Sequence, residues 1–419
     1  MRNLIVTAVI ALEASFSGIA SAQSFRRDTD TVIMGAGYRN MVFYQLQTGR
    51  QDTAARCGWH LAFEVPIRGA AIRVNHPCGV TLYKTTRDTS QWAVLSLSDT
   101  VTALYDDLCK WERGAFNTTA GPSAFDVGWG IYNLSDHITR GDSLYIIRVG
   151  NTFKKFWIQR LEGSSYFIRI ANLDGSQDTA YAVSKTIASG KNFVYLNLLT
   201  HQVYSIEPDP AQWDLVFTQY AKFISPPNNP STPVLYNLTG VLINQKVKAA
   251  RVRLSRQANP DTITISAYPL DSCISIIGDD WKSFVSGQWI LADTLYFLVQ
   301  DRAGRLWRVR FIDFGGSATG RVVLEKALIQ SASTGLDMAL TERFLVYPNP
   351  VREGFSVSLP SAFSGDVELY ALTGERLLFL AANGEETVYV PRPVGLGPGF
   401  YILRIRSGTK TASQAVIFE

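Results

Sequence analysis

The chain contains the stretch Asn40-Met41-Val42-Phe43-Tyr44-Gln45-Leu46-Gln47-Thr48, which recurs 152 residues later as Asn192-Phe193-Val194-Tyr195-Leu196-Asn197-Leu198-Leu199-Thr200. Three further blocks recur in the same order at offsets of 151 to 154 residues: Trp59-His60-Leu61-Ala62-Phe63 with Trp213-Asp214-Leu215-Val216-Phe217, Trp129-Gly130-Ile131-Tyr132 with Trp281-Lys282-Ser283-Phe284, and Asp142-Ser143-Leu144-Tyr145-Ile146-Ile147 with Asp293-Thr294-Leu295-Tyr296-Phe297-Leu298. Self-similarity at a fixed period is typical of a repeated structural unit. The sequence therefore predicts two tandem copies of one domain of about 150 residues.

Each repeated block has the pattern of a β-strand. In residues 59–63 the large apolar side chains alternate, so we expect Trp59, Leu61 and Phe63 on one face and His60 on a solvated opposite face. We expect Trp213 to occupy the same core position in the second copy. Aromatic residues make up 12% of the chain and favour strands over helices. The predicted fold class is all-β.

The N-terminus has the pattern of a secretory signal peptide, residues 1–22. Arg2 gives a positive start, residues 4–12 form an apolar run, and Ala20-Ser21-Ala22 fits a cleavage site before Gln23. The run is too short for a membrane span, which needs ~20 apolar residues. We therefore expect export by the Sec machinery and no transmembrane span.

The charge pattern gives no support for nucleic-acid binding. The formal net charge is +4, charged residues make up 18% of the chain, and no basic run is present.

The chain has four cysteines: Cys57, Cys78, Cys109 and Cys273. None lies at a spacing typical of zinc ligands, and an exported chain passes through an oxidising compartment, so we expect two disulfides. Three pairings are open. We favour Cys57–Cys78, because these residues flank two successive strands that can pair as neighbours.

The last 75 residues carry an ordered set of motifs. Tyr347-Pro348-Asn349-Pro350 is followed by an alternating strand at 355–359, a Leu372-Thr373-Gly374 turn and a late Gly399-Phe400-Tyr401 strand. This order resembles the C-terminal sorting domain of type IX secretion substrates. The resemblance covers residues 345–419 and implies a small immunoglobulin-like β-sandwich.

The same resemblance implies a location and a partner. The partner is the type IX secretion apparatus, and the location is secreted or on the outer-membrane surface of a Gram-negative bacterium, reached through the periplasm. The sequence leaves open whether the protein is released or stays attached, for example to surface lipopolysaccharide.

The repeated blocks resemble the HmuY-like family of secreted all-β haem-binding proteins. The first copy carries its Tyr-x-Leu-x-Thr-Gly strand at 44–49, its Trp-x-Leu-x-Phe strand at 59–63 and its Val-Asn pair at 74–75. In the second copy Phe284-Val285 replaces the Tyr-Asn of Tyr132-Asn133, so this copy is the more divergent. The predicted domains are 23–185 and 186–332, joined by a linker at 333–344 to the sorting domain.

The resemblance raises the question of haem, whose iron needs axial ligands such as histidine. The ligands of the family lie outside the shared motifs, so none is carried over directly. By position we favour His76, which lies in a turn between apolar strands. His60 or His137 would supply the second ligand.

One motif is typical of an enzyme. Gly141-Asp142-Ser143-Leu144 matches a hydrolase signature, but no downstream Asp-x-x-His supplies a base, and the second copy has Ala292-Asp293-Thr294-Leu295 at this place. We therefore expect a non-enzymatic surface protein that binds an exogenous ligand or partner. The alternatives are a haem-binding protein and a structural or adhesive component.

Overall fold

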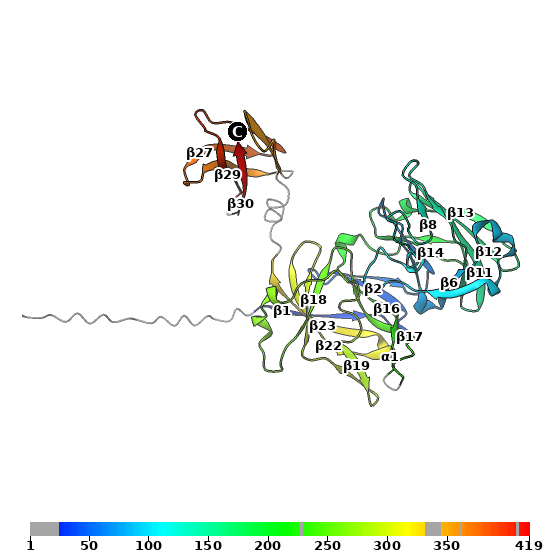
Figure 1. Cartoon of the computed structure of the whole chain (residues 1–419). Coiled ribbons are helices and arrows are strands. Elements are labelled where there is room, and N and C mark those ends of the chain that lie inside the picture. The colour runs from blue at the N-terminus through cyan, green and yellow to red at the C-terminus, as the bar shows by residue number, and fades with distance from the viewer. Residues whose placement is uncertain (1–24, 227–228, 332–344, 360–362, 408–409) are drawn as a thin grey trace, which may run out of the picture. The chain divides into compact units, whose positions relative to one another are not determined.

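The structure, a computed structural model, describes residues 25–226, 229–331, 345–359, 363–407 and 410–419. The expected signal peptide, its cleavage site between Ala22 and Gln23, and the linker 333–344 lie outside the described residues. Most residues up to Ile329 form one compact unit, and residues 330–419 together with the short segment 302–306 form another. The described chain is almost entirely β, which confirms the predicted fold class (Figure 1).

The first unit contains two β-sandwich lobes. Lobe I is residues 57–206, and lobe II is residues 25–56 together with 207–331. In lobe I an inner sheet has the order β15-β14-β4-β5, and an outer sheet has the order β13-β12-β11-β10-β6-β7 with β9 and β8 attached at β11. The strands are β4 (Leu61–Glu64), β5 (Ile72–Val74), β6 (Val80–Thr85), β7 (Thr100–Leu104), β8 (Gly130–Tyr132), β9 (Thr139–Gly141), β10 (Tyr145–Val149), β11 (Thr152–Glu162), β12 (Ser165–Asn172), β13 (Thr179–Ser184), β14 (Phe193–Leu196) and β15 (Val203–Tyr204).

Lobe II has the same two-layer plan. Its inner sheet has the order β17-β16-β2-β3, its outer sheet has the order β1-β23-β22-β21-β18, and β19 and β20 form a separate hairpin. The elements are β1 (Arg27–Ile33), β2 (Asn40–Tyr44), β3 (Gln51–Ala55), β16 (Leu215–Ile224), β17 (Val234–Ile243), β18 (Lys248–Arg253), β19 (Lys282–Val285), β20 (Gln288–Leu291), β21 (Leu295–Gln300), β22 (Leu306–Phe314), α1 (Gly316–Thr319) and β23 (Arg321–Gln330).

Short 3-10 helices occur in the connections of both lobes. They are η1 (Ala36–Tyr38), η2 (His76–Cys78), η3 (Thr89–Val94), η4 (Leu97–Asp99), η5 (Ala115–Asn117), η6 (Lys185–Ala188), η7 (Pro210–Gln212), η8 (Pro260–Thr262) and η9 (Ile265–Ala267). None of the helices within the described residues has the length and apolar character needed to cross a membrane.

Each lobe has an apolar core between its two sheets. In lobe I, Leu61 and Phe63 of the inner sheet pack in one cluster with Phe156 of the outer sheet. In lobe II, Leu215 and Phe217 take the corresponding places. Since side chains on a strand alternate between its faces, these residues leave the opposite face of each inner sheet for other contacts.

Each lobe combines strands of both sequence repeats. The first three strands of one repeat lie in the same lobe as the remaining strands of the other repeat. Strands β1 and β2 pair with β23 and β16 of the second repeat, whereas β13 and β14 of the second repeat pair with β12 and β4 of the first. In Figure 1 the blue strands β1 and β2 accordingly lie among green and yellow strands. The two repeats have exchanged their first three strands.

This exchange places the division between the lobes away from the expected boundary at residues 185 and 186. Strands β1–β3 lie in the lobe of the second half of the chain, and β14 and β15 lie in the lobe of the first. Strand β13, the counterpart of β1 at the 152-residue offset, already precedes the expected boundary. The two lobes share strands because the short connection at residues 56–60 leads from β3 in lobe II to β4 in lobe I. A connection that kept β3 and β4 in the same lobe would place each repeat in its own sandwich.

The second unit is a sandwich of two antiparallel sheets, with the orders β24-β25-β28 and β27-β26-β29-β30. Its core includes Phe355, Val367 and Leu403. The strands are β24 (Leu345–Tyr347), β25 (Gly354–Ser358), β26 (Ser364–Ala371), β27 (Arg376–Asn383), β28 (Thr387–Pro391), β29 (Gly399–Ser407) and β30 (Lys410–Phe418).

The motifs of this unit have structural roles. The side chain of Asn349 accepts from the Ile417 N–H at 2.9 Å and donates to the Ala415 carbonyl at 3.1 Å, so it fastens the start of the unit to β30. Two cis peptide bonds, before Pro348 and Pro350, flank that side chain. Gly374 has a φ of 88° in the β26–β27 turn, a conformation that favours glycine. The Tyr401 hydroxyl donates to the Gly397 carbonyl at 2.9 Å.

The strand exchange predicts which fragment of the chain folds. Residues 57–206 carrying Cys109→Ser should unfold cooperatively, because they contain both sheets of lobe I. Residues 25–185 should not, because they lack β14 and leave β1–β3 without partner strands. Near-ultraviolet circular dichroism during heating measures this, and a sharper transition in the 25–185 fragment would contradict the exchange.

Candidate functional site

The two inner sheets are apolar on both faces. One face of each sheet packs in the core of its own lobe, and the other face packs against the inner sheet of the other lobe. In β2, Val42 and Tyr44 point into the core of lobe II, whereas Met41 and Phe43 belong to a second cluster on the opposite face. In β14 the corresponding residue to Phe43 is Tyr195. Trp111 and Ile206 pack against both second-face clusters and join them into one contact, here called the seam.

Two equivalent aromatic pairs form the centre of the seam. Phe43 packs edge-on against Trp213 with ring centroids 5.0 Å apart and an interplanar angle of 69°. Tyr195 packs on Trp59 in the same way, at 5.0 Å and 70°. Each pair joins one residue from each sequence repeat. The seam therefore has the approximate two-fold symmetry of the repeat itself.

The expected shared face for Trp59, Leu61 and Phe63 is wrong, because Trp59 lies in the seam and the other two lie in the core of lobe I. Trp59 precedes the first residue of β4, so the alternation does not reach it. The Asn75 side chain instead holds the Trp59 carbonyl at 3.0 Å.

The second copy repeats this arrangement. Trp213 lies in the seam before β16, and the Asn244 side chain donates to its carbonyl at 2.8 Å. Trp59 and Trp213 are thus equivalent to each other, but at the contact between the lobes rather than in their cores.

The expected solvated position of His60 is also wrong. His60 is buried, and its Nδ1 accepts the Leu198 N–H at 2.9 Å. Its counterpart Asp214 is buried and accepts the Leu46 N–H at 2.8 Å. Each side chain thus accepts a backbone N–H of a loop, His60 in the loop after β14 and Asp214 in the loop after β2. His60 is therefore a structural cap, and burial lowers its pKa.

A loop of lobe I, residues 105–113 (here called the strap), crosses the seam. The expected Cys57–Cys78 disulfide is confirmed, and the second disulfide, Cys109–Cys273, joins the strap to lobe II. The Trp111 indole N–H donates to the Ile243 carbonyl of lobe II at 3.0 Å. The lobes are thus joined covalently as well as by apolar contact.

The buried Arg73 supports the strap from within lobe I. Its guanidinium donates to the Lys110 carbonyl at 2.9 Å and to the Asp107 carbonyl at 3.0 Å, and it lies over the Trp111 ring at 5.1 Å from the centroid. Arg73 therefore serves as the anchor of the strap rather than as a free charge.

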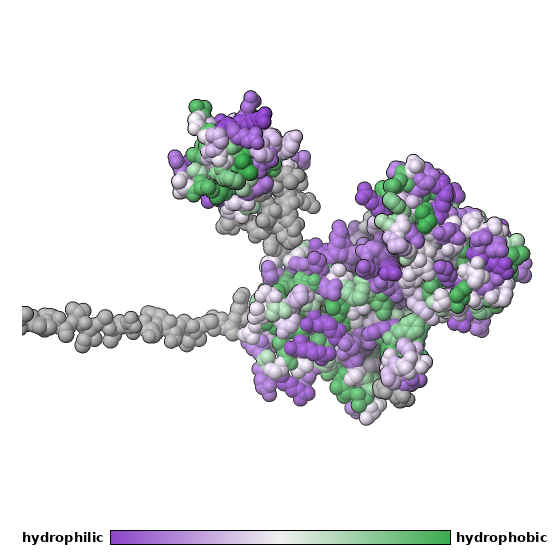
Figure 2. Space-filling model, viewed as in Figure 1, coloured by the Kyte–Doolittle hydropathy of each residue, from purple (hydrophilic) through white to green (hydrophobic). Residues whose placement is uncertain are grey.

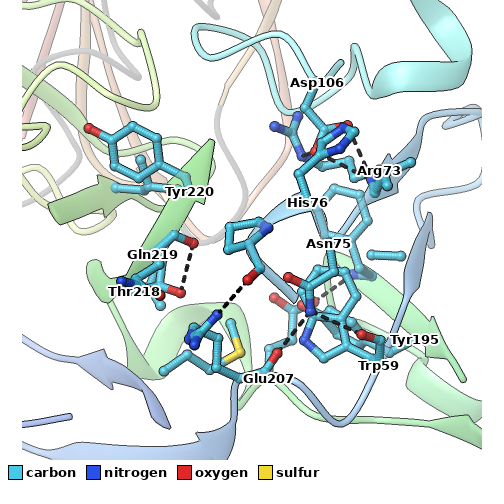
Figure 3. A pocket seen from close by; sticks show the side chains of 18 of the residues that line it. Trp59, Arg73, Asn75, His76, Asp106, Tyr195, Glu207, Thr218, Gln219 and Tyr220 are labelled. Carbon is cyan, nitrogen blue, oxygen red and sulfur yellow. Dashed lines mark hydrogen bonds and ion pairs between the residues drawn. The ribbon is translucent and has the colours of Figure 1, made fainter. Parts of the chain in front are cut away.

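Beneath the strap the seam contains a partly open cavity of about 100 Å³. Its walls are mainly aromatic and apolar, and polar side chains such as His76, Asp106 and Gln219 lie among them. Figure 3 shows Gln219 and Tyr220 of β16 on one side and His76, Asn75 and Trp59 on the other. The aromatic lining residues are Phe43, Trp59, Trp111, Phe193, Tyr195, Trp213 and Tyr220.

Three polar nitrogens of the cavity walls are buried without a hydrogen-bond partner among the described residues: Trp59 Nε1, Trp213 Nε1 and His76 Nε2. Most buried polar groups in proteins are paired, so each unpaired group calls for an explanation. The two tryptophan nitrogens are equivalent under the repeat.

Glu207 is a buried acid in the cavity wall. Its carboxyl group accepts from the Phe193 N–H at 2.5 Å and from the Asn192 side chain at 3.3 Å. Burial raises the pKa of Glu207 from its usual 4.5 to about 8. The group therefore keeps its proton at neutral pH and adds no charge to the cavity.

The structure brings only one of the three candidate histidines to the cavity. His76 starts η2, in the turn where the sequence places it. His60 is engaged by Leu198, and His137 lies in the exposed β8–β9 connection, where its Nδ1 is 2.6 Å from the Tyr132 hydroxyl.

The sequence interpretation missed Trp111, Arg73, Glu207 and Tyr220. One available signal was the continuous apolar run at residues 41–44, which is typical of a strand buried on both faces.

Comparison with known proteins identifies the second compact unit. Residues 345–419 match the family described as the secretion system C-terminal sorting domain. This unit is therefore a type IX secretion sorting domain, which indicates that the protein is secreted or displayed at the cell surface and that the secretion apparatus is its partner.

No curated protein matches the chain. The crystal structure of apo PinO from Porphyromonas gingivitis is similar over 74% of this chain and 100% of that chain, with 9% identity and a TM-score of 0.22.

Glu207 makes stability depend on pH. Its folded pKa lies above its unfolded value, so the folded chain keeps a proton that the unfolded chain releases, and stability falls as pH rises from about 4.5 to 8. Glu207→Gln should remove this fall, which amounts to at most ~1.4 kcal/mol per pH unit. Urea unfolding of both proteins at pH 5 and pH 8 measures it. Parallel pH profiles would contradict the assignment.

The two disulfides should differ in their contribution to stability. They close chain separations of 164 residues for Cys109–Cys273 and 21 for Cys57–Cys78. Loop-closure entropy then gives roughly 5 and roughly 3 kcal/mol. Urea unfolding of the two double cysteine-to-serine variants compares them, and a larger loss in the Cys57–Cys78 variant would contradict this order.

Proposed function

We propose that the protein is a non-catalytic binding protein that type IX secretion delivers to the cell surface or the medium, and that it holds a small exogenous ligand between its lobes. One observation carries the proposal. The seam cavity is lined mainly by aromatic and apolar side chains of both lobes, with a few polar groups among them. Ligand sites typically combine apolar walls with a few placed polar groups.

The polar groups around the cavity support binding rather than catalysis. Asp106 accepts from the Ala115 N–H at 2.7 Å, and Arg73 is occupied by strap carbonyls. Both groups are committed to the fold. Ser143, the serine of the hydrolase-like motif, donates to Asp142 at 2.8 Å in the connection before β10 and is not among the residues of the cavity wall.

A haem-binding role is the second candidate, and the unpartnered His76 Nε2 favours it. The resemblance of the repeats to the HmuY-like family points the same way and stays a prediction. The cavity of about 100 Å³ is smaller than a porphyrin, so haem would enter only if the lobes separated. Visible spectra after addition of haemin decide: a low-spin spectrum that disappears in His76→Ala would support this candidate.

Binding in the cavity is testable with benzene as the probe. A ligand that binds only the folded state raises its stability. We expect benzene to raise the melting temperature of the protein by a few degrees. Val216→Phe, which fills the cavity, should abolish the rise, as measured by differential scanning calorimetry.

The matched control is Val234→Phe, the same change at an exposed position of β17 outside the cavity wall. It should leave the rise unchanged. Absence of a rise in the unmodified protein, or an equal rise in Val216→Phe, would overturn the proposal.

A further inference from the structure

The strap forms part of the wall of the seam cavity. Asp106, Leu108 and Trp111 of the strap are among the residues that line the cavity. Val216 and Leu242 line it from lobe II. The size of the cavity, about 100 Å³, therefore depends on how close the strap lies to lobe II.

On the side of lobe II, the strap is held by a few hydrogen bonds and one covalent bond. The Ile274 N–H donates to the Cys109 carbonyl at 3.2 Å, and the Ser275 N–H donates to the Leu108 carbonyl at 3.1 Å. Hydrogen bonds of this kind each contribute little net stability. The Cys109–Cys273 disulfide is therefore the bond that prevents the strap from leaving lobe II.

On the side of lobe I, the strap stays attached without the disulfide. The buried Arg73 donates to the Lys110 and Asp107 carbonyls, and the Asp107 carboxylate accepts the Cys109 N–H at 2.7 Å within the strap. These bonds do not involve lobe II. When the disulfide is broken, we expect the strap to remain a folded part of lobe I while its contact with lobe II opens.

The position of the disulfide permits its reduction. Cys109 is an exposed residue, Cys273 is half-buried, and the Ser275 hydroxyl lies 3.8 Å from the Cys273 sulfur. A thiolate of a dithiol that attacks the Cys109 sulfur expels the Cys273 thiolate, which the Ser275 hydroxyl can stabilise and which then takes up a proton. The second thiol of the dithiol releases Cys109 and closes the reductant's own disulfide, so two electrons pass to the protein.

We propose that the Cys109–Cys273 disulfide is a redox switch of the seam cavity: a small dithiol cleaves it, the strap separates from lobe II, and the cavity then accepts ligands larger than one aromatic ring. This inference rests on the proposed function and adds the regulation of the same cavity. An apolar cavity of ~150 Å³ takes up benzene. The oxidised cavity is smaller than that, so opening of the strap matters most for a larger guest.

The test compares a one-ring probe, fluorobenzene, with a two-ring probe, 1-fluoronaphthalene, before and after addition of dithiothreitol. The protein is Cys57→Ser/Cys78→Ser, which keeps the Cys109–Cys273 disulfide. Fluorine NMR titration gives the Kd of each probe. We expect the two-ring preference, the Kd of fluorobenzene divided by that of 1-fluoronaphthalene, to rise at least about tenfold on reduction, because the opened cavity buries more of the larger probe.

The matched control is Cys109→Ser/Cys273→Ser, which cannot form the strap disulfide. Its two-ring preference should equal that of the reduced protein, with and without dithiothreitol. If fluorobenzene binds and reduction does not raise the preference, cavity binding stands and the switch is refuted. A Cys109–Cys273 bond that resists dithiothreitol in the folded protein refutes the switch as well. If fluorobenzene binds neither the oxidised nor the reduced protein, the proposed function fails with it.

A second measurement covers the case in which Cys57→Ser/Cys78→Ser does not fold. Hydrogen exchange of the unmodified protein, read by mass spectrometry, follows the backbone amides of Ile274 and Ser275, which donate to the strap. Their exchange should become at least about tenfold faster after reduction, because each opening of the strap frees both donors. Exchange in β21, which pairs with β18, should not change. Equal exchange of Ile274 and Ser275 in the two states would overturn the inference.

Discussion

The contact between the two inner sheets determines the arrangement of the first compact unit. Phe43 on Trp213 and Tyr195 on Trp59 each join a residue of one sequence repeat to a residue of the other. Each inner sheet therefore has a core on one face and the seam on the other. A strand such as β2 must then be apolar on both faces, which is the pattern of residues 41–44.

The exchange of strands between the repeats links this contact to the cavity. Because β2 pairs with β16 and β14 pairs with β4, each lobe contains strands from both repeats, and the lobes cannot separate without straining the connection at residues 56–60. The Cys109–Cys273 disulfide adds a second link. A cavity placed between lobes that are linked in this way suits selection of a ligand by size.

A second hollow among the described residues differs in character from the seam cavity. Hydrophobic and hydrophilic residues are interspersed on the face shown in Figure 2, whereas the aromatic side chains of the seam are largely buried. A second hollow in lobe I, of about 650 Å³, is open and is lined by Arg68, Lys110 and Glu112 among others. Its mixed charges show no preference for one class of ligand.

Local pattern predicted the strands and one disulfide. The alternation of Leu61 and Phe63 gave the core face, and the two strands between Cys57 and Cys78 gave their pairing. The motifs from Tyr347 onward predicted the sorting domain, because each has a local role in a turn or strand.

The exchange was not predictable, since β2 carries the same pattern whether it pairs with β4 or with β16. The connection between β3 and β4 decides between them, and its residues, among them Cys57 and Trp59, do not indicate which lobe the chain enters. The cavity was missed for the same reason, because its walls come from both lobes. Trp59 and His60 were misplaced because the alternation was extended past the start of β4.

Cross-linking of the first strand tests the exchange most directly. Ile33 of β1 lies opposite Arg321 of β23, and both side chains are exposed. Lys185 is the counterpart of Ile33 in the second repeat, and its N–H donates to the Ser164 carbonyl. Without exchange, Ile33 would therefore lie opposite Ser164. Mass spectrometry of the oxidised protein should find a disulfide between positions 33 and 321 in Ile33→Cys/Arg321→Cys and none between 33 and 164 in Ile33→Cys/Ser164→Cys. A cross-link in the second variant and none in the first would contradict the exchange.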